Sequence, residues 1–533
     1  MNQIEAKKQK IEYCCYVIGL ISFMVLGSLI GNNGITYMAV IIECVSLFVL
    51  LVNSGGSDLI GKLIRTRRKK NQYKEAAQLH RAYLLIQCIT AVVMMAAYFL
   101  LTDFFANVVF KMPYLAIAMK ILTPVILLKT LQCVMSGYFQ GMGAHMPTVV
   151  CAIFRQLLFL LFGLLLTGRL TAYGEKVSAL LNNMDYAGMY GAVGLCLAIV
   201  ISEIFVSIFL LIVYIGSDRK REKRKSEDGL QKTESFSERF RLIALVSFPE
   251  TMKAILKKLP FMLSIFIVLW NATDVSKVSH EFGVFYGYFI CVCAIPVFAV
   301  SVQITQILSR LTAAMKKKDN RGVREILYAG MHYCWAMGLF ISVFMAVLAP
   351  QISKVIQIDS TDVLQQYFAQ GTAIIAILIM CIFIWKSLNI LGARSLTYML
   401  LALLNVVFVL SCVILRSREM DTIAVLIFSG LIACAIELIV SYVIIVRKYF
   451  LQPDLIRGFL IPLAAAGGMG LASMLLQHLL SPHVSSFVCL LLCFILSAVI
   501  YMVVLTATRS ITETEVKHVY GPIGQKLLGM IIR

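Results

Sequence analysis

The sequence predicts an all-α protein that crosses a membrane many times. Hydrophobic residues make up 60% of the 533 residues, charged residues only 14%, and the mean hydropathy is +0.86. Soluble domains contain about a quarter charged residues. A helix needs about 20 apolar residues to cross a bilayer, and such runs recur along the whole chain. We therefore expect a polytopic integral membrane protein.

We predict about fourteen spanning helices. The apolar run near the N-terminus is long enough to span and lacks a small-residue cleavage site, so it counts as the first span and not as a signal peptide. The predicted spans are 13–31, 35–60, 82–102, 113–138, 147–167, 189–215, 243–270, 283–309, 327–349, 366–390, 395–415, 421–446, 457–478 and 484–507.

Positive charge alternates between the loops. Between Lys62 and Arg81 there are eight Lys or Arg residues, in 219–241 nine and in 310–324 six, whereas the loop at 271–282 has only Lys277. Basic loops stay in the cytoplasm and lie against anionic phospholipids. This pattern predicts that both termini lie on the cytoplasmic side of the membrane. We expect a cell membrane, such as a bacterial inner membrane. It also accounts for the net charge of +20 without nucleic-acid binding.

Two parts of the sequence resemble each other. The basic loop that begins at Lys62 matches the loop that begins at Arg310 at an offset of 248, and 143–145 matches 392–394 at an offset of 249. Six spans separate the copies, so both halves have the same orientation and a pseudo-two-fold axis along the membrane normal is expected. The predicted parts are an N-lobe (1–216), a basic linker (217–241), a C-lobe (242–450) and two extra spans with a tail (451–533).

The span 243–270 contains three lysines. The stretch 260–270 would be a helix of only about 16 Å, half the hydrocarbon thickness, so the span has to include the lysines. One acid cannot neutralise three bases, and a cation at this depth favours an anionic partner such as a lipid pyrophosphate. A structural Glu250–Lys253 ion pair is the alternative. The predicted substrate-binding residues here are Lys253, Lys257, Lys258 and Glu250.

Other intramembrane charges are weaker candidates. Lys120 and Lys129 are further cations for the substrate site, but nine residues place them on opposite faces of one helix. Glu203 and Glu437 occupy comparable places in the sixth and twelfth spans, where each either pairs with a lysine or binds a coupling ion. Asp58 follows a glycine break and is either a coupling residue or a helix cap.

Features of an enzyme are missing. The sequence has no Walker A pattern and no nucleophile, metal or nucleotide motif. Its 15 cysteines lie mostly in apolar spans, without CxxC pairs. We expect a non-enzyme without a cofactor, apart from H⁺ or Na⁺ as a coupling ion.

Short motifs resemble a known family. GGSDLIGKL (55–63), NQYKEA (71–76), SGYFQGMGAHMPT (136–148) and AIPVFAVSVQITQILSRL (294–311) are similar to the polysaccharide flippase branch of the multidrug/oligosaccharidyl-lipid/polysaccharide (MOP) exporter superfamily. Within it, the chain resembles the stage V sporulation protein B-like group, relatives of the lipid II flippase. Unlike that flippase, the first span has no arginine. Arg155 precedes Gln156 where relatives often have an acid.

The resemblance implies a flippase with two six-helix lobes, whose extra helices form a groove for a lipid tail. The expected cargo is an undecaprenyl-pyrophosphate-linked saccharide or a peptidoglycan precursor, moved by alternating access. Two alternatives stay open: a cation-coupled multidrug antiporter of the same fold, and a non-transporting scaffold for envelope synthesis. The sequence does not identify the glycan, the coupling ion, the oligomeric state or a protein partner.

Overall fold

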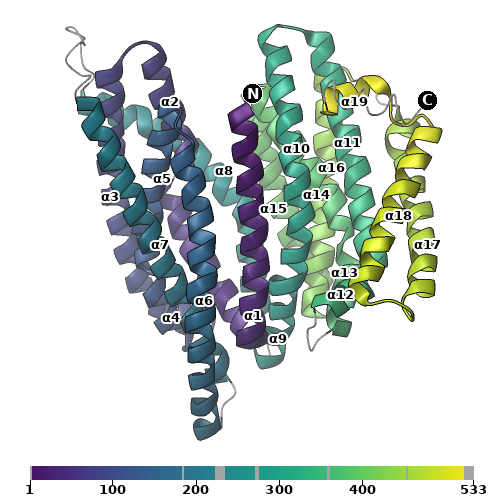
Figure 1. Cartoon of the computed structure of the whole chain (residues 1–533), viewed down its shortest axis with the longest axis horizontal. Coiled ribbons are helices and arrows are strands. Elements are labelled where there is room, and N and C mark those ends of the chain that lie inside the picture. Colours follow the sequence, from purple (N-terminus) through teal and green to yellow (C-terminus); the bar gives the residue numbers. More distant parts are fainter. Residues whose placement is uncertain are drawn as a thin grey trace. The chain divides into compact units, whose positions relative to one another are not determined.

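The computed structural model describes residues 3–53, 55–182, 185–222, 235–270, 275–356, 361–418, 420–451 and 454–520. Within these ranges every regular element is helical and no strand occurs, which confirms the all-α prediction (Figure 1). The chain forms two compact units, a first unit of Lys7–Gly287 and a second unit of Met1–Ala6 with Tyr288–Arg533.

The division into units does not follow the predicted linker 217–241, of which residues 223–234 lie outside the described ranges, as does the tail 521–533. A division by compactness groups residues that pack together, whereas the predicted lobes are bodies that move during transport. The predicted lobe boundaries therefore stay predictions.

The first unit contains most of α1 together with the helices up to α9. Here α6 and α7 run side by side as an antiparallel pair (Figure 1). The bounds of the helices in this unit are α1 (Gln3–Val52), α2 (Gly56–Lys69), α3 (Tyr73–Phe104), α4 (Leu115–Leu122), α5 (Pro124–Met142), α6 (Met146–Leu181), α7 (Asp185–Glu222), α8 (Phe236–Trp270) and α9 (Val275–Val284), with a π-helical segment at Phe105–Val109.

The main part of the second unit begins at Tyr288, inside the π-helical segment Phe285–Ile290. Its last two long helices pack against each other, and the short final helix contacts α10 and α11. The bounds are α10 (Cys291–Lys316), α11 (Asn320–Val347), α12 (Ala349–Ile356), α13 (Thr361–Gly371), α14 (Ala373–Ile390), α15 (Arg394–Arg416), α16 (Thr422–Tyr449), a π-helical segment (Ile456–Leu460), α17 (Ile461–Leu480), α18 (Ser486–Ala507) and α19 (Glu513–Tyr520).

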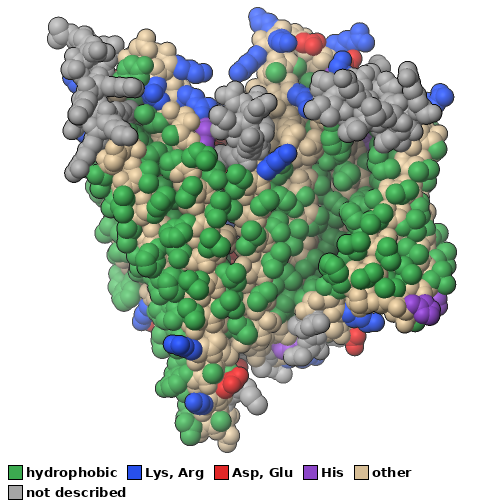
Figure 2. All heavy atoms as spheres, in the orientation of Figure 1, with side chains coloured by type: hydrophobic (Ala, Val, Ile, Leu, Met, Phe, Trp, Pro, Cys, Tyr) green, Lys and Arg blue, Asp and Glu red, His purple; other side chains and the backbone are tan. Residues whose placement is uncertain are grey.

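The helices fit the predicted number of spans. Twelve helical stretches among the described residues are long and apolar enough to cross a membrane, and the first of them, Lys10–Lys69, contains two predicted spans. Helix α8 covers the predicted span 243–270 as well. Hydrophobic side chains cover the middle of α6 in the first unit and of α17 and α18 in the second (Figure 2). The chain is therefore a multi-pass membrane protein.

Glycines break the helices of the first two spans. Within α1, Gly31 has φ 72° and ψ 169°, a backbone conformation that essentially only glycine adopts. The predicted continuous span 35–60 is wrong: α1 ends at Val52 and α2 begins at Gly56, with φ 79° at Gly55 and 63° at Gly56. Two successive left-handed residues cannot continue a right-handed helix.

The internal repeat is visible in the backbone. Gly143 and Gly392 end α5 and α14 with φ of 81° and 80°. In both caps the following alanine N–H bonds the carbonyl oxygen five residues before it, Ala144 to Phe139 and Ala393 to Leu388. Each of these helices also begins directly after a break in its predicted span, at Thr123 and at Thr372. Residues 249 positions apart therefore have the same cap conformation as well as a similar sequence.

Candidate functional site

Helix α8 carries the three predicted lysines in the first unit. The helix is continuous through Pro249 and Pro260. Lys253 Nζ lies 3.8 Å from Glu250 Oε2, which is the ion pair given by the i, i+3 spacing. The side chain of Lys257 is exposed. Among these residues, only Lys253 has the partner that the sequence suggested.

The third lysine has a partner on α1. Lys258 Nζ lies 3.0 Å from Glu43 Oε2, and the hydroxyl of Tyr286 donates to Glu43 Oε1 at 3.0 Å. The lysine and the glutamate side chains are 20% and 10% exposed, so this pair is largely removed from solvent. We call Glu43, Glu250, Lys253, Lys257 and Lys258 the α8 cluster.

A second charged cluster surrounds Glu203 on α7. The Glu203 carboxylate is 4% exposed and forms ion pairs with Lys129 Nζ on α5 and with Arg155 Nε on α6, the latter at 3.0 Å. Gln132 Nε2 donates to Glu203 Oε2 at 2.8 Å and to Ser207 Oγ at 2.9 Å. A buried carboxylate with this many donors is held as an anion. We call Lys129, Arg155 and Glu203 the α7 cluster.

The two clusters together carry excess positive charge. Five cationic side chains accompany three carboxylates, so these eight side chains of the first unit have a formal excess of two positive charges. In the α7 cluster the cations are partly accessible, at 31% for Lys129 and 30% for Arg155, while the acid is buried. This arrangement presents cations and hides the anion, which is suited to binding a negatively charged group.

Lys120 lies in a different environment from Lys129. A helix break at Thr123 separates the two lysines, with Lys120 on α4 and Lys129 on α5. The Lys120 ammonium lies 2.8 Å from Asp103 Oδ1 at the end of α3, and both side chains are substantially exposed. Lys120 therefore forms a local surface pair, separate from the two clusters.

Glu437 on α16 is the counterpart of Glu203 in the second unit, but its surroundings differ. The side chain is fully buried, and Trp385 Nε1 on α14 donates to Glu437 Oε1 at 2.8 Å. Its other oxygen, Oε2, has no hydrogen-bond partner, and no described Lys, Arg or His nitrogen lies within 4.0 Å of it. An unpaired ionised carboxylate is costly at such a position.

Asp58 is exposed in the first turn of α2, directly after the left-handed Gly55. The N-cap residue of α2 is Gly55, so Asp58 is the third residue of the helix and not its N-cap. A carboxylate in the first turn still interacts favourably with the helix dipole. Within the described ranges no group of three or more His, Cys, Asp or Glu residues is arranged to hold a metal ion.

Five residues of these surroundings are absent from the sequence-based site: Glu43, Gln132, Arg155, Tyr286 and Trp385. The charges of Glu43 and Arg155 inside apolar runs are a signal that could have identified them. The other three are ordinary residues of apolar or amphipathic helices. Their roles depend on partners 52 to 243 residues away in the sequence.

Comparisons with known proteins give one family match and several matches of fold. Residues 11–269 match the family described as polysaccharide biosynthesis protein. A solved structure of the lipid II flippase MurJ in an inward closed conformation has a TM-score of 0.66 and 11% identity, covering 94% of this chain and 98% of that one. A comparison with curated protein sequences gives no match.

Drug transporters share the fold as well. An inward-facing multidrug resistance MATE family transporter gives a TM-score of 0.59 at 11% identity, over 83% of this chain and 94% of that one. A MOP superfamily transporter from Pyrococcus furiosus, whose binding pocket is described as having reverse polarity, gives 0.53 at 13% identity over 83% and 96%. The chain thus resembles the polysaccharide biosynthesis protein family over residues 11–269, and as a whole it has the fold of these flippase and MATE transporter structures.

Proposed function

We propose that the protein is a flippase that moves an anionic lipid-linked oligosaccharide or peptidoglycan precursor across the cytoplasmic membrane by alternating access. The observation that carries this proposal is the excess of two positive charges in the α8 and α7 clusters. Cationic drugs would be repelled by such a site, whereas a pyrophosphate would be attracted. The lipid II flippase fold match supports the same substrate class.

The cations of the two clusters would together bind the pyrophosphate of an undecaprenyl-pyrophosphate-linked saccharide. Arg155 has a planar fork that suits phosphate oxygens, and the lysines act as point charges. Because Lys129 and Arg155 already share one carboxylate, an incoming phosphate would complete the charge balance without breaking the Glu203 contacts. Lys257, the exposed member of the α8 cluster, would meet the same ligand.

A groove in the second unit supports a route for the lipid tail. It has a volume of about 980 Å³ and lies between α17 and the α11–α13 region. Its apolar wall is formed by Leu471, Met474 and Leu475 on α17. The side-chain amides of Gln365 and Gln366 on α13 line it as well. The predicted role of the extra helices is to guide the tail along this wall.

The expected coupling ion is H⁺, bound at Glu437. A fully buried carboxyl group that has neutral donors and no cationic partner among the described residues is favoured in its neutral form. The Glu203 carboxylate, by contrast, is neutralised by cations and would not exchange a proton. Both termini are proposed to be cytoplasmic, on the basis of the basic loops.

The experiment that tests this function measures flipping of a fluorescent undecaprenyl-pyrophosphate saccharide in proteoliposomes. The wild type is compared with Lys253→Gln/Lys257→Gln and with Arg155→Gln. Lys120→Gln is the matched control, because that lysine is paired locally with Asp103. We expect flipping by the wild type and the control, and loss in the other two variants.

Other outcomes would overturn parts of the proposal. Equal flipping by every folded variant would make the lysines and Arg155 structural. Transport of a cationic dye in place of the saccharide would identify a multidrug antiporter. The fold match to a MATE transporter supports this alternative. If neither compound moved, a non-transporting scaffold would be favoured.

A further inference from the structure

The final helix α19 is fastened to the end of the second unit. A capping box starts it: Glu515 N–H donates to Thr512 Oγ1 at 3.3 Å, and Thr512 N–H donates to Glu515 Oε2 at 3.1 Å. Its last turn is bound by α10, because Gln303 Nε2 donates to the Val519 carbonyl at 2.7 Å and Arg310 donates to the His518 carbonyl. The capping box thus fixes the start of the helix, and α10 holds its last turn.

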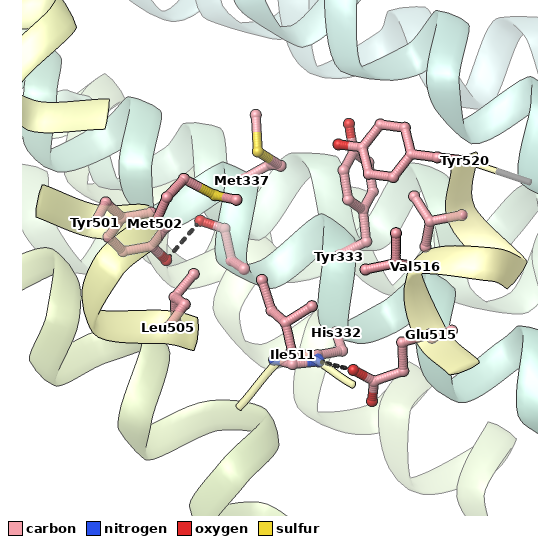
Figure 3. A pocket seen from close by; sticks show the side chains of 13 residues that line it. His332, Tyr333, Met337, Tyr501, Met502, Leu505, Ile511, Glu515, Val516 and Tyr520 are labelled. Carbon is pink, nitrogen blue, oxygen red and sulfur yellow. Dashed lines mark hydrogen bonds and ion pairs between the residues drawn. The ribbon is translucent and has the colours of Figure 1, made fainter. Parts of the chain in front are cut away.

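An apolar cavity of about 270 Å³ lies between α19, α11 and α18. Figure 3 shows the side chains of Tyr333, Met337, Met502, Leu505 and Val516 converging on it from the three helices. The hydrogen-bonded pair of His332 and Glu515, 3.2 Å apart, lies at one edge. Apolar cavities of about 150 Å³ already stay dry and bind apolar ligands, so a cavity of this size is suited to a hydrocarbon chain.

The apolar cavity reaches the surface of the unit. Met502 on α18 is 43% exposed and Tyr520 on α19 is 50% exposed, and both line it. Because α18 is a membrane-spanning candidate, this surface faces lipid. The adjoining end of α10 and α11 carries the basic loop 310–324, which the positive-inside rule assigns to the cytoplasmic leaflet.

A polar cavity of about 460 Å³ adjoins the apolar one, and Glu515 lines both. It is lined by three carboxylates and three basic side chains. Its pairs are Arg321 with Glu325 at 2.9 Å, His518 with Glu325 at 3.4 Å and Arg457 with Asp454 at 3.5 Å, while Glu515 pairs with His332 of the apolar cavity at 3.2 Å.

These polar pairs can be rearranged at little cost. Arg457 and Asp454 are 60% and 48% exposed, and Arg321 is 91% exposed. Exposed ion pairs contribute little to stability, since water competes with them. A ligand with one cationic and one anionic group could therefore insert between the partners and bond both.

We propose that the two cavities together bind one phospholipid with a zwitterionic head group that bears a primary ammonium, that is, a phosphatidylethanolamine. One acyl chain lies in the apolar cavity under α19. The phosphate accepts hydrogen bonds from Arg321 and Arg457, and the ammonium donates to Asp454 and Glu325. Balanced charges disfavour an anionic lipid, and a choline head group has no N–H to donate.

The head group, and not the chain, gives this site its selectivity. A hydrocarbon chain gains little by moving from the bilayer into an apolar cavity, because lipid tails are equally apolar. Charge-assisted hydrogen bonds to the head group are made only in the site. Substitutions in the polar cavity should therefore change which lipid binds, while filling the apolar cavity should remove every lipid.

The experiment uses the purified full-length protein in detergent with an equimolar mixture of phosphatidylethanolamine, phosphatidylcholine and phosphatidylglycerol. Retained lipid is counted by native mass spectrometry. We expect one phosphatidylethanolamine per wild-type chain. Met502→Trp, which fills the apolar cavity from its exposed edge, should weaken retention about tenfold. Arg457→Gln/Glu325→Gln should abolish the preference over phosphatidylcholine.

Val499→Trp is the matched control, because Val499 lies one turn earlier on α18, is 53% exposed and does not line the cavity. It should retain lipid as the wild type does. Equal retention of the three lipids by the wild type, or equal retention by the two tryptophan variants, would overturn the proposal. A preference for phosphatidylglycerol would also overturn it, in favour of an anionic-lipid site. None of these readouts depends on transport.

Discussion

At the scale of single residues, the most informative contrast is between Glu203 and Glu437. Each lies on the sixth span of its predicted half and bonds a residue of the fourth, Gln132 for Glu203 and Trp385 for Glu437. Glu203 is paired with two cations, whereas the described donors to Glu437 are neutral: Trp385 and Cys381. Acids at comparable places in two related halves therefore have different surroundings.

Replacing the first of these acids should destabilise the protein. Glu203→Gln leaves Lys129 and Arg155 without their shared anion. Breaking a fully buried ion pair costs about 3–5 kcal/mol, and the partial exposure of both cations reduces this to about 2–3 kcal/mol. Thermal unfolding in detergent measures the effect. Lys120→Gln, which breaks an exposed pair, should change stability by less than about 1 kcal/mol.

Replacing the second acid should affect coupling and leave stability almost unchanged. Glu437→Gln keeps an acceptor for Trp385 Nε1 and mimics the protonated acid, so the fold should persist. In proteoliposomes the variant should exchange cargo between the two faces but should no longer accumulate it when a pH gradient is imposed. Wild-type accumulation in Glu437→Gln would exclude this residue as the proton site.

The sequence predicted only part of the charged site, for a reason visible in particular pairs. Glu250 and Lys253 are three residues apart on one helix, so spacing alone brings them together. Glu43 and Lys258 come from helices far apart in the chain, and nothing in either segment indicates the other. Whether a lysine can bind an anionic ligand depends on such long-range partners, because they decide whether its charge is already neutralised.

At the scale of elements, apolar run length predicted the helices well, because about 20 apolar residues are a physical requirement for crossing a bilayer. Breaks inside a run were harder to predict. The end of α1 at Val52 depends on two glycines with positive φ, and the start of α5 depends on Pro124 following Thr123. Such residues permit a break, and packing decides whether it occurs.

The break in α1 gives a test of backbone strain. Gly31 has φ 72° and ψ 169°, and no atom lies within 4 Å of the position of an added Cβ. Gly31→Ala should therefore cost about 1–3 kcal/mol through strain alone. Gly168 in α6 has equal space but no positive φ, so Gly168→Ala should be neutral or stabilising by up to about 1 kcal/mol. Thermal unfolding of the two variants compares them directly, and equal shifts would contradict the strain argument.

At the scale of the whole molecule, orientation follows from the basic loops. A phosphatase reporter that is active only outside the cytoplasm should be inactive when fused after Lys318 and active when fused after Lys111. A fluorescent protein that folds only in the cytoplasm should give the opposite pattern. Active phosphatase at both sites, or at Lys318 alone, would contradict the predicted topology.

The fold class could be predicted for the whole chain, whereas the grouping of its helices could not. Composition fixes a helical membrane protein, because only helices and closed barrels satisfy backbone groups in lipid. The boundary between the compact units at Gly287 and Tyr288 lies inside a π-helical segment of ordinary apolar sequence. No composition change marks it, unlike the basic linker that the sequence favoured.

The matching caps at Gly143 and Gly392 have an evolutionary consequence. Two copies that keep the same turn after 249 residues indicate descent from one duplicated gene, whose product would have worked as a pair of identical parallel halves. Fusion of the copies would have let each half change alone. Under the proposed function, the charged site for cargo and the site for the driving ion would then have arisen from halves that were once identical.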